Sequence, residues 1–258
     1  MKRLLGLTAL AVSLAGCAGN AATVGQRIER ALVNAPGVAQ PSRVVATELE
    51  FARAARDDGQ WTAFRKFAAS GALIHGRSGP INAVTYLSGL DDPEEAVRWN
   101  PRAVWMSCDS LLAVSQGRFR DPKGTIGSFI TVWQRQPNGD YRWTYDVAVA
   151  DDPQPPPRDP AEPAGEDEIV VSALDAVQGF VADCPKRGLT MAQPPEASIA
   201  QGTRHALTSS PDGTLRWRWE HKAGTERRFV AEYLTGGQWE VALNESLGLA
   251  SAPEQAQD

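Results

Sequence analysis

Residues Gly127 to Ala150 read GSFITVWQRQPNGDYRWTYDVAVA, and this stretch decides the fold of the chain. Two runs rich in β-branched and aromatic residues flank the turn sequence Pro137-Asn138-Gly139-Asp140. Asn-Gly readily adopts the positive φ angles that a tight hairpin turn requires. In the second run, alternate residues from Tyr141 to Val149 are apolar and share one face. We therefore predict a long antiparallel hairpin whose apolar face is covered by other elements.

The sequence before this hairpin changes from a helical to a strand-like pattern. Apolar side chains recur every three to four residues over 42–58, over 60–69 and again after Gly79, which predicts three helices. Four strand-like segments follow, at about 97–107, 111–120, 126–136 and 140–149. Helices followed by a run of strands are typical of an α+β fold.

Several short motifs in this part of the chain resemble one known superfamily. They are W-x-x-F-x-x-F-A from Trp61 to Ala68, G-P-I-N-A-V-x-Y-L from Gly79 to Leu87, F-R-D-P from Phe119 to Pro122, T-V-W from Thr131 to Trp133, and Trp143 with Asp146. Their order resembles the nuclear transport factor 2-like superfamily, and within it a bacterial branch of unknown function related to steroid isomerases and polyketide cyclases. The resemblance covers residues 42–150, under half of the chain.

The resemblance implies an α+β fold in which helices pack on a strongly curved antiparallel sheet and form a cone. The mouth of such a cone can hold a small molecule. On this basis we expect four aromatic side chains to line a pocket: Tyr86, Trp105, Trp133 and Tyr145. We expect a smaller, mainly-β C-terminal domain to follow.

The second half of the chain begins with a segment that cannot bury a core. Residues 151–168, DDPQPPPRDPAEPAGEDE, contain six prolines and seven acidic residues, which predicts an extended, self-repelling linker. Residues 169–250 predict a small β-rich domain, because Trp217 and Trp219 alternate with charged residues and glycine turns separate the later strands. The polar residues 251–258 predict a frayed tail.

The N-terminus has the pattern of a lipoprotein signal peptide over residues 1–16. Lys2 and Arg3 precede an apolar run that is short for a membrane span. Leu14-Ala15-Gly16-Cys17 then resembles the lipobox of bacterial lipoproteins, in which the cysteine receives the lipid. An ordinary signal peptide with a chance cysteine is the alternative. By resemblance to the sorting of enterobacterial lipoproteins, Ala18 rather than Asp after the cysteine favours the outer membrane, facing the periplasm. Residues 17–41 would then be the lipidated tether.

The charge and the remaining cysteines restrict the possible partners. Residues 1–16 contain two of the 26 basic side chains and none of the 31 acidic ones, which leaves a net charge of −7. Such a balance argues against nucleic acid as a partner. Cys108 and Cys184 are an even pair in a compartment that oxidises thiols, so they are a candidate disulfide. Two reduced, buried thiols are the alternative.

Two residues are candidates for catalysis. His75 follows a short extended segment, near the position where the isomerase-like relatives place an acidic general base, and histidine titrates near neutral pH. Asp146 is the one acid within the apolar second arm of the hairpin. A structural histidine and an acid that binds backbone amides are the alternatives. The three histidines have no metal-ligand spacing, and we expect neither a metal nor another cofactor.

Three functions fit these observations. The first is an envelope lipoprotein without catalytic activity, anchored to the membrane through Cys17, that binds a small apolar ligand or a partner protein. The second is a small-molecule isomerase or dehydratase that uses His75 and Asp146. The third is a structural module whose sheet forms a homodimer, as the resemblance implies.

Overall fold

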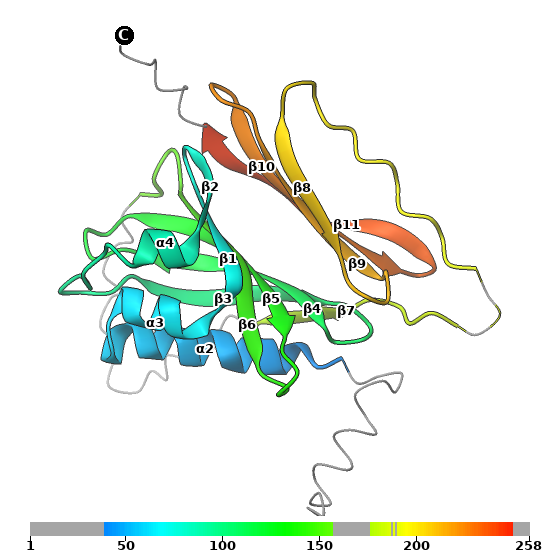
Figure 1. Ribbon diagram of the computed structural model, residues 1–258, viewed down its shortest axis with the longest axis horizontal. Helices are drawn as coiled ribbons and strands as arrows, with labels where there is room; N and C mark the ends of the chain where they lie inside the picture. Colours follow the sequence, from blue (N-terminus) through cyan, green and yellow to red (C-terminus); the bar gives the residue numbers. More distant parts are fainter. Residues whose placement is uncertain (1–38, 157–175, 187, 189, 250–258) are drawn as a thin grey trace, which may run out of the picture.

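The computed structural model describes residues 39–156, 176–186, 188 and 190–249, which form two sheets and three helices (Figure 1). The helices are α2 (Pro41–Asp57), α3 (Gln60–Phe67) and α4 (Ala83–Leu87). The first sheet contains β1 (Ala68–Gly76), β2 (Gly79–Asn82), β3 (Arg98–Met106), β4 (Leu112–Arg120), β5 (Ile126–Arg135), β6 (Tyr141–Ala150) and β7 (Gln178–Val181). The second sheet contains β8 (Arg204–Ser209), β9 (Leu215–His221), β10 (Glu226–Thr235) and β11 (Gln238–Leu249). The predicted signal peptide, most of the tether and linker, and the tail lie outside the described residues.

The predicted fold class, helices packed on a strongly curved antiparallel cone, is wrong. The three described helices contain 17, 8 and 5 residues, and far more of the described residues are in strands than in helices. The first sheet is mixed, in the order β2-β1-β6-β5-β4-β3-β7, because β1 runs parallel to β6 and β7 runs parallel to β3. The apolar residues after Gly79 were expected to begin a helix, but Gly79–Asn82 pairs with β1 as a strand. Short apolar runs do not distinguish helix from strand.

The meander expected over residues 97–149 is present as β3 to β6, and the Asn138-Gly139 turn joins its last two strands. The second arm of this hairpin departs from strict alternation. Opposite Trp133 lies Trp143, and opposite Val132 lies Tyr145, so Thr144 is an extra residue in the ladder. This β-bulge exchanges the two faces of β6, because residues on either side of a bulge no longer follow one period of two. Trp143 therefore faces the helices, whereas Tyr145 faces the second sheet.

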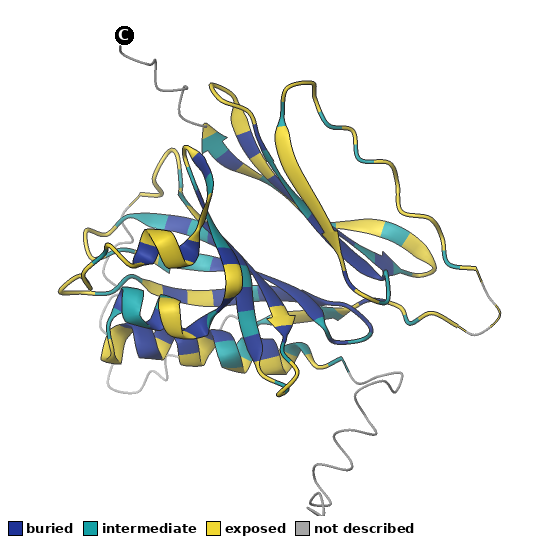
Figure 2. Cartoon of the chain, in the orientation of Figure 1, coloured by how far each residue is buried: buried dark blue, intermediate teal, exposed yellow. Residues whose placement is uncertain are grey.

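The first sheet is the middle of three layers (Figure 1). The helices cover one face, where Phe51 of α2 packs against Trp99 and Trp133. The second sheet covers the other face, where Trp217 and Phe229 pack around Tyr145. Burial on both faces explains why buried residues run almost without interruption along the central strands (Figure 2). The C-terminal strands, expected as a smaller separate domain, thus share an apolar core with the first sheet.

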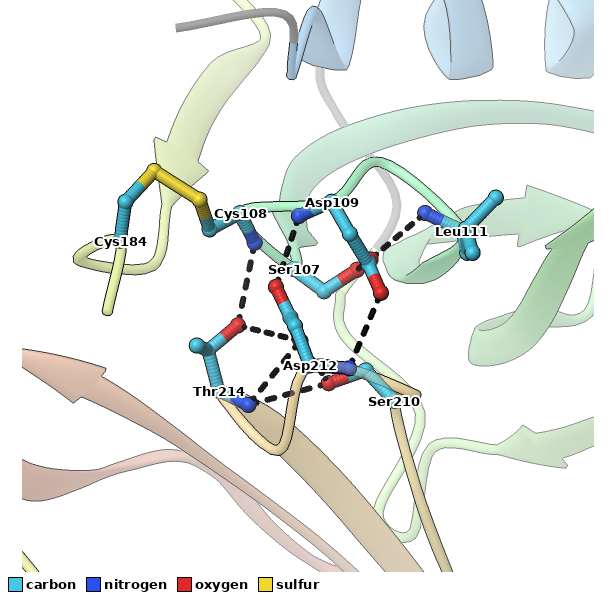
Figure 3. Close-up of a disulfide and its surroundings, with 8 residues drawn as sticks. All are labelled: Ser107, Cys108, Asp109, Leu111, Cys184, Ser210, Asp212 and Thr214. Carbon is cyan, nitrogen blue, oxygen red and sulfur yellow. Dashed lines mark hydrogen bonds between the residues drawn. A yellow bond between two sulfur atoms is a disulfide. The ribbon is translucent and has the colours of Figure 1, made fainter. Parts of the chain in front are cut away.

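A pair of turns joins the two sheets at one end, beside a disulfide that links the segments after two neighbouring strands of the first sheet (Figure 3). Cys108, after β3, is bonded to Cys184, after β7, with Cα atoms 5.1 Å apart. Next to it, the Asp109 backbone N–H donates to Asp212 Oδ2 at 2.7 Å, and the Asp212 backbone N–H donates to Asp109 Oδ2 at 3.1 Å. The Cys108 backbone N–H also donates to Thr214 Oγ1 at 3.0 Å. The expected disulfide is thus present, within a reciprocal set of hydrogen bonds.

Candidate functional site

A cavity of about 320 Å³ lies on the helix side of the first sheet. Helices α2, α3 and α4 form one wall, and strands β1 and β3 to β6 form the other. The aromatic side chains that line it are Phe51, Trp61, Phe64, Tyr86, Trp99, Phe119 and Phe129. These rings support one another, since the centroid of Phe51 lies 4.8 Å from that of Phe64 and 4.9 Å from that of Trp99. A preformed apolar cavity of this size is typical of a small-molecule site.

The first acid of the cavity is Glu48, on the buried face of α2, and it is fully buried. The indole N–H of Trp99 donates to its Oε1 at 2.9 Å, and Ser115 Oγ donates to its Oε2 at 2.8 Å. Burial raises the pKa of Glu48 to about 7, and the charge of Asp146 adds to this effect, while the hydrogen bonds to Ser115 and Trp99 oppose it. Burial therefore disfavours the charged form of Glu48 and brings its pKa near neutral pH.

The second acid is Asp146, which the bulge in β6 places on the helix side of the sheet. Its partner across the strands is Thr131, whose Oγ1 donates to Asp146 Oδ2 at 2.8 Å. The side chain is only 9% exposed, and burial raises its pKa to about 7. Neither lysine nor arginine lines the cavity among the described residues. The cavity thus holds two buried acids without a protein cation to neutralise them.

His75 also borders the cavity, but its ring lies on the opposite face of the sheet. Nδ1 is 2.7 Å from the hydroxyl of Tyr145, and Nε2 is 3.2 Å from Nδ1 of His221 in β9. Burial lowers the pKa of His75 to about 3, and the nearby Arg227, His221 and Arg204 lower it further. His75 is therefore neutral, and both of its ring nitrogens are engaged between the two sheets.

The predicted pair of His75 and Asp146 is not brought together as an acid–base pair. Their strands are neighbours, since the residue before His75 lies opposite Asp146 in the β1–β6 ladder. The His75 ring faces the second sheet, whereas the Asp146 carboxyl faces Thr131 and the helices. Adjacent positions along paired strands point to opposite faces, which separates the two side chains.

The four predicted pocket residues have different locations. Tyr86 lines the cavity and is 42% exposed, which places it at the mouth. Trp133 is fully buried in the core under the helices rather than on the cavity lining, and its indole N–H donates to Ser115 Oγ at 3.0 Å. Trp105 and Tyr145 face away from the cavity, because Trp105 stacks on Phe180 of β7 and Tyr145 packs on Trp217 of β9. For these last three, the prediction of pocket lining is wrong.

Glu48 is not among the candidate residues predicted from the sequence, although the sequence contains a signal for it. Val44, Phe51 and Ala55 recur at helical spacing and form the buried side of α2. Glu48 lies four residues after Val44 and three before Phe51, so it occupies the same apolar stripe. An acid at such a position is buried by the fold, and buried acids are frequent at functional sites.

The sequence matches no protein-family model, and no curated protein matches it significantly. The resemblance to the nuclear transport factor 2-like superfamily therefore rests on the quoted motifs alone. None of the described helices is long and apolar enough to cross a membrane. Within the described residues, no group of His, Cys, Asp and Glu side chains is arranged to hold a metal ion.

Proposed function

We propose that this chain is a lipoprotein of the bacterial outer membrane, facing the periplasm, whose helix-side cavity binds a small, mainly apolar ligand. The observation that carries the binding function is the cavity of about 320 Å³ with aromatic walls. Apolar walls with a few polar groups that converge on the interior are the usual features of a small-molecule site. Thr131, Glu48 and Asp146 supply those polar groups here.

The membrane part of the proposal rests on the sequence Leu14-Ala15-Gly16-Cys17, which lies outside the described residues. Several acyl chains on one cysteine give stable anchoring, because each buried CH2 contributes about 0.8 kcal/mol. Substitution of Cys17→Ser should abolish incorporation of labelled fatty acid and release the protein from the outer-membrane fraction. Unchanged labelling and fractionation of this variant would contradict lipid anchoring.

Ligand binding is tested by native mass spectrometry of the protein purified from its own envelope. Ala148 lines the cavity from an exposed position on β6, so Ala148→Trp should obstruct the cavity without overpacking the core. Ala206 is an exposed alanine on β8 and provides the matched control, Ala206→Trp. A bound small molecule should be found in the wild type and in Ala206→Trp and be lost from Ala148→Trp. Equal occupancy in all three proteins would place binding elsewhere.

A second candidate function is a small-molecule enzyme of the isomerase or dehydratase type. The observation that favours it is the presence of two buried acids with a pKa of about 7 in one cavity, since proton transfer is most efficient when the pKa lies near the working pH. In this version Glu48 replaces His75 as the partner of Asp146. Asp146→Asn should then abolish turnover while ligand binding persists; turnover that survives in both Asp146→Asn and Glu48→Gln would exclude this candidate.

The homodimer remains a prediction. Within the described part of the chain, β8 to β11 cover the face of the first sheet that lies away from the helices. A second copy would therefore have to pair through another surface. Sedimentation equilibrium of the detergent-solubilised protein distinguishes a monomer from a dimer.

A further inference from the structure

The charge of the cavity restricts which ligand can occupy it. Among the described residues, four titratable groups face the interior or border it: Glu48 from α2, Tyr86 from α4, His75 from β1 and Asp146 from β6. His75 is neutral and engaged on the opposite face of the sheet. Deprotonation of either buried acid therefore leaves a negative charge without a counter-charge on the wall. An anionic ligand would meet repulsion there, whereas a cation would supply the missing charge.

Asp146 is the acid with hydrogen-bonding capacity left for a ligand. Both carboxyl oxygens of Glu48 already accept hydrogen bonds, from Trp99 and Ser115. Asp146 accepts one, at Oδ2 from Thr131, and within the described residues its Oδ1 has no hydrogen-bond partner. The side chain is more than nine-tenths buried and lines the cavity, so its free oxygen is available to an occupant of the cavity.

The aromatic walls favour the same type of ligand. The face of an aromatic ring carries negative potential and attracts a cation within about 6 Å of the ring centroid. Rings from α3, β3 and β4 converge on the cavity, among them Trp61, Trp99 and Phe119. Aromatic rings around a buried carboxylate are a suitable environment for an organic ammonium group, because they replace part of its lost hydration.

We propose that the ligand of this cavity is a small organic cation, an amine or quaternary ammonium with an apolar body, which pairs with Asp146 Oδ1 inside the aromatic walls. This inference rests on the proposed binding function and specifies the chemical class of its ligand.

The proposal implies a direction for the pH dependence of binding. Burial raises the pKa of Asp146 to about 7, and that of Glu48 to about 7 as well, so the charge on this pair of acids increases as the pH rises from 6 to 8. A permanent cation gains from the charged form only. Its affinity should therefore rise between pH 6 and pH 8, whereas the affinity of a neutral compound should not.

The experiment compares two probes of equal shape. Benzyltrimethylammonium is a permanent cation, and neopentylbenzene is its neutral carbon isostere. Binding to the mature lipidated chain in detergent is followed by tryptophan fluorescence, with protein-free micelles measured in parallel. We expect the cation to bind at least about tenfold more tightly than its isostere at pH 8, and this advantage to shrink at pH 6.

Variants assign the effect to one side chain. Asp146→Asn should weaken cation binding by about tenfold and leave the neutral probe within about twofold. Asp57→Asn removes the same charge at the exposed end of α2 and should change neither affinity. The pH dependence of the wild type needs no variant, so it remains decisive if Asp146→Asn fails to fold.

The outcomes distinguish failure of the cationic-ligand inference from failure of the proposed binding function. Equal affinities for the two probes, or cation binding that does not change between pH 6 and pH 8, would overturn the cationic ligand and leave an apolar binding site. Failure of both probes to bind, in a protein whose melting temperature is normal, would overturn both proposals.

Discussion

The chain contains two four-stranded meanders, β3 to β6 and β8 to β11, and the turn between the first two strands has the same structure in both. Ser107 and Ser210 occupy equivalent places, and the backbone N–H of each donates to the carbonyl of the leucine five residues later, at 2.9 and 2.8 Å. Each serine Oγ also donates to the aspartate two residues later, at 2.5 and 2.6 Å. Ser110 and Gly213, one residue after each aspartate, have φ angles of 62° and 68°. The two turns then bond each other through these aspartates, which makes the arrangement reciprocal.

The meanders differ in whether a buried acid has a cationic partner. In the second meander, Arg216 Nε lies 2.8 Å from Glu232 Oε2, and Arg218 Nη1 lies 3.4 Å from the same oxygen. In the first meander, which the helices cover, Asp146 lines a cavity and has no described cation beside it. The arginines offset the charge of the paired acid within the fold, whereas an unpaired acid in a cavity costs stability and is retained more readily for a function. We therefore place the candidate binding site on the first meander, and we interpret the second meander as the layer that stabilises it.

The largest expected effect concerns the disulfide beside the first turn, which ties the segment after β7 to the first meander. Cys108 and Cys184 are 76 residues apart, so replacing both with serine should lower the free energy of unfolding by about 4–5 kcal/mol in the chain-entropy model. Urea unfolding of the double variant, compared with the oxidised wild type, measures this loss. A loss below about 1 kcal/mol would mean that the pairing of β7 with β3 holds this edge of the first sheet without the disulfide, and would contradict the expected contribution.

A smaller effect is expected at His75, where the two sheets meet. His75→Ala should lower the free energy of unfolding by about 3 kcal/mol at pH 7, because it leaves a cavity and removes the partners of Tyr145 and His221. The folded-state pKa of about 3 lies below the unfolded value of about 6.5, so the contribution of neutral His75 is present above pH 6.5 and is lost as the pH falls toward 3. Thermal melting between pH 4 and pH 7 should therefore be less pH-dependent in the variant than in the wild type. An unchanged melting temperature at pH 7 would remove His75 from the interface between the sheets.

The smallest expected effect is that of removing the charge of one buried acid. The change in the free energy of unfolding should have opposite signs for the unpaired Glu48 and for Glu232, which is paired with arginines. The raised pKa of Glu48 means that its contribution is favourable below about pH 4 and is lost as the pH rises through about 7. Glu48→Gln should therefore raise the free energy of unfolding by about 2 kcal/mol at pH 8 and change it little at pH 5. Glu232→Gln, the matched change in the second meander, should lower it by about 2 kcal/mol at pH 8, because it leaves Arg216 and Arg218 without their shared partner. Urea unfolding at pH 5 and pH 8 checks both variants, and destabilisation of both to the same extent would erase the contrast.

Local pattern predicted the parts of this fold that depend on local chemistry. The Asn138-Gly139 turn and the strand-like segments around it predicted the meander, and the redox compartment implied by the lipobox predicted the pairing of Cys108 with Cys184. The second sheet could not be placed from the sequence, because its contacts with the first sheet are all distant in the chain. That missing layer is why Trp105 was assigned to a pocket although it lies in the core between the two sheets, beside Phe180 of the neighbouring strand β7.

The candidate site was predicted in part. Asp146 was identified as an unusual acid, and Tyr86 lines the cavity as expected. The bulge at Thr144 could not be read from a strictly alternating pattern, and this one extra residue reverses the side to which Tyr145 points. Glu48 could not be assigned to a site in the same way, because helical periodicity predicts which side of α2 is buried but not that this side borders a cavity.

The central claim is that two buried acids line the cavity between the helices and the first meander, with no cation beside them in the described part of the chain. Carbon-13 NMR of the mature protein, with labelled side-chain carboxyl groups of Asp and Glu, measures the titration of both acids directly. The structure predicts midpoints near pH 7 for Glu48 and for Asp146, because burial raises the pKa of each to about 7. Midpoints near the ordinary value of about 4 for both groups would mean that water solvates the cavity, and would contradict the account.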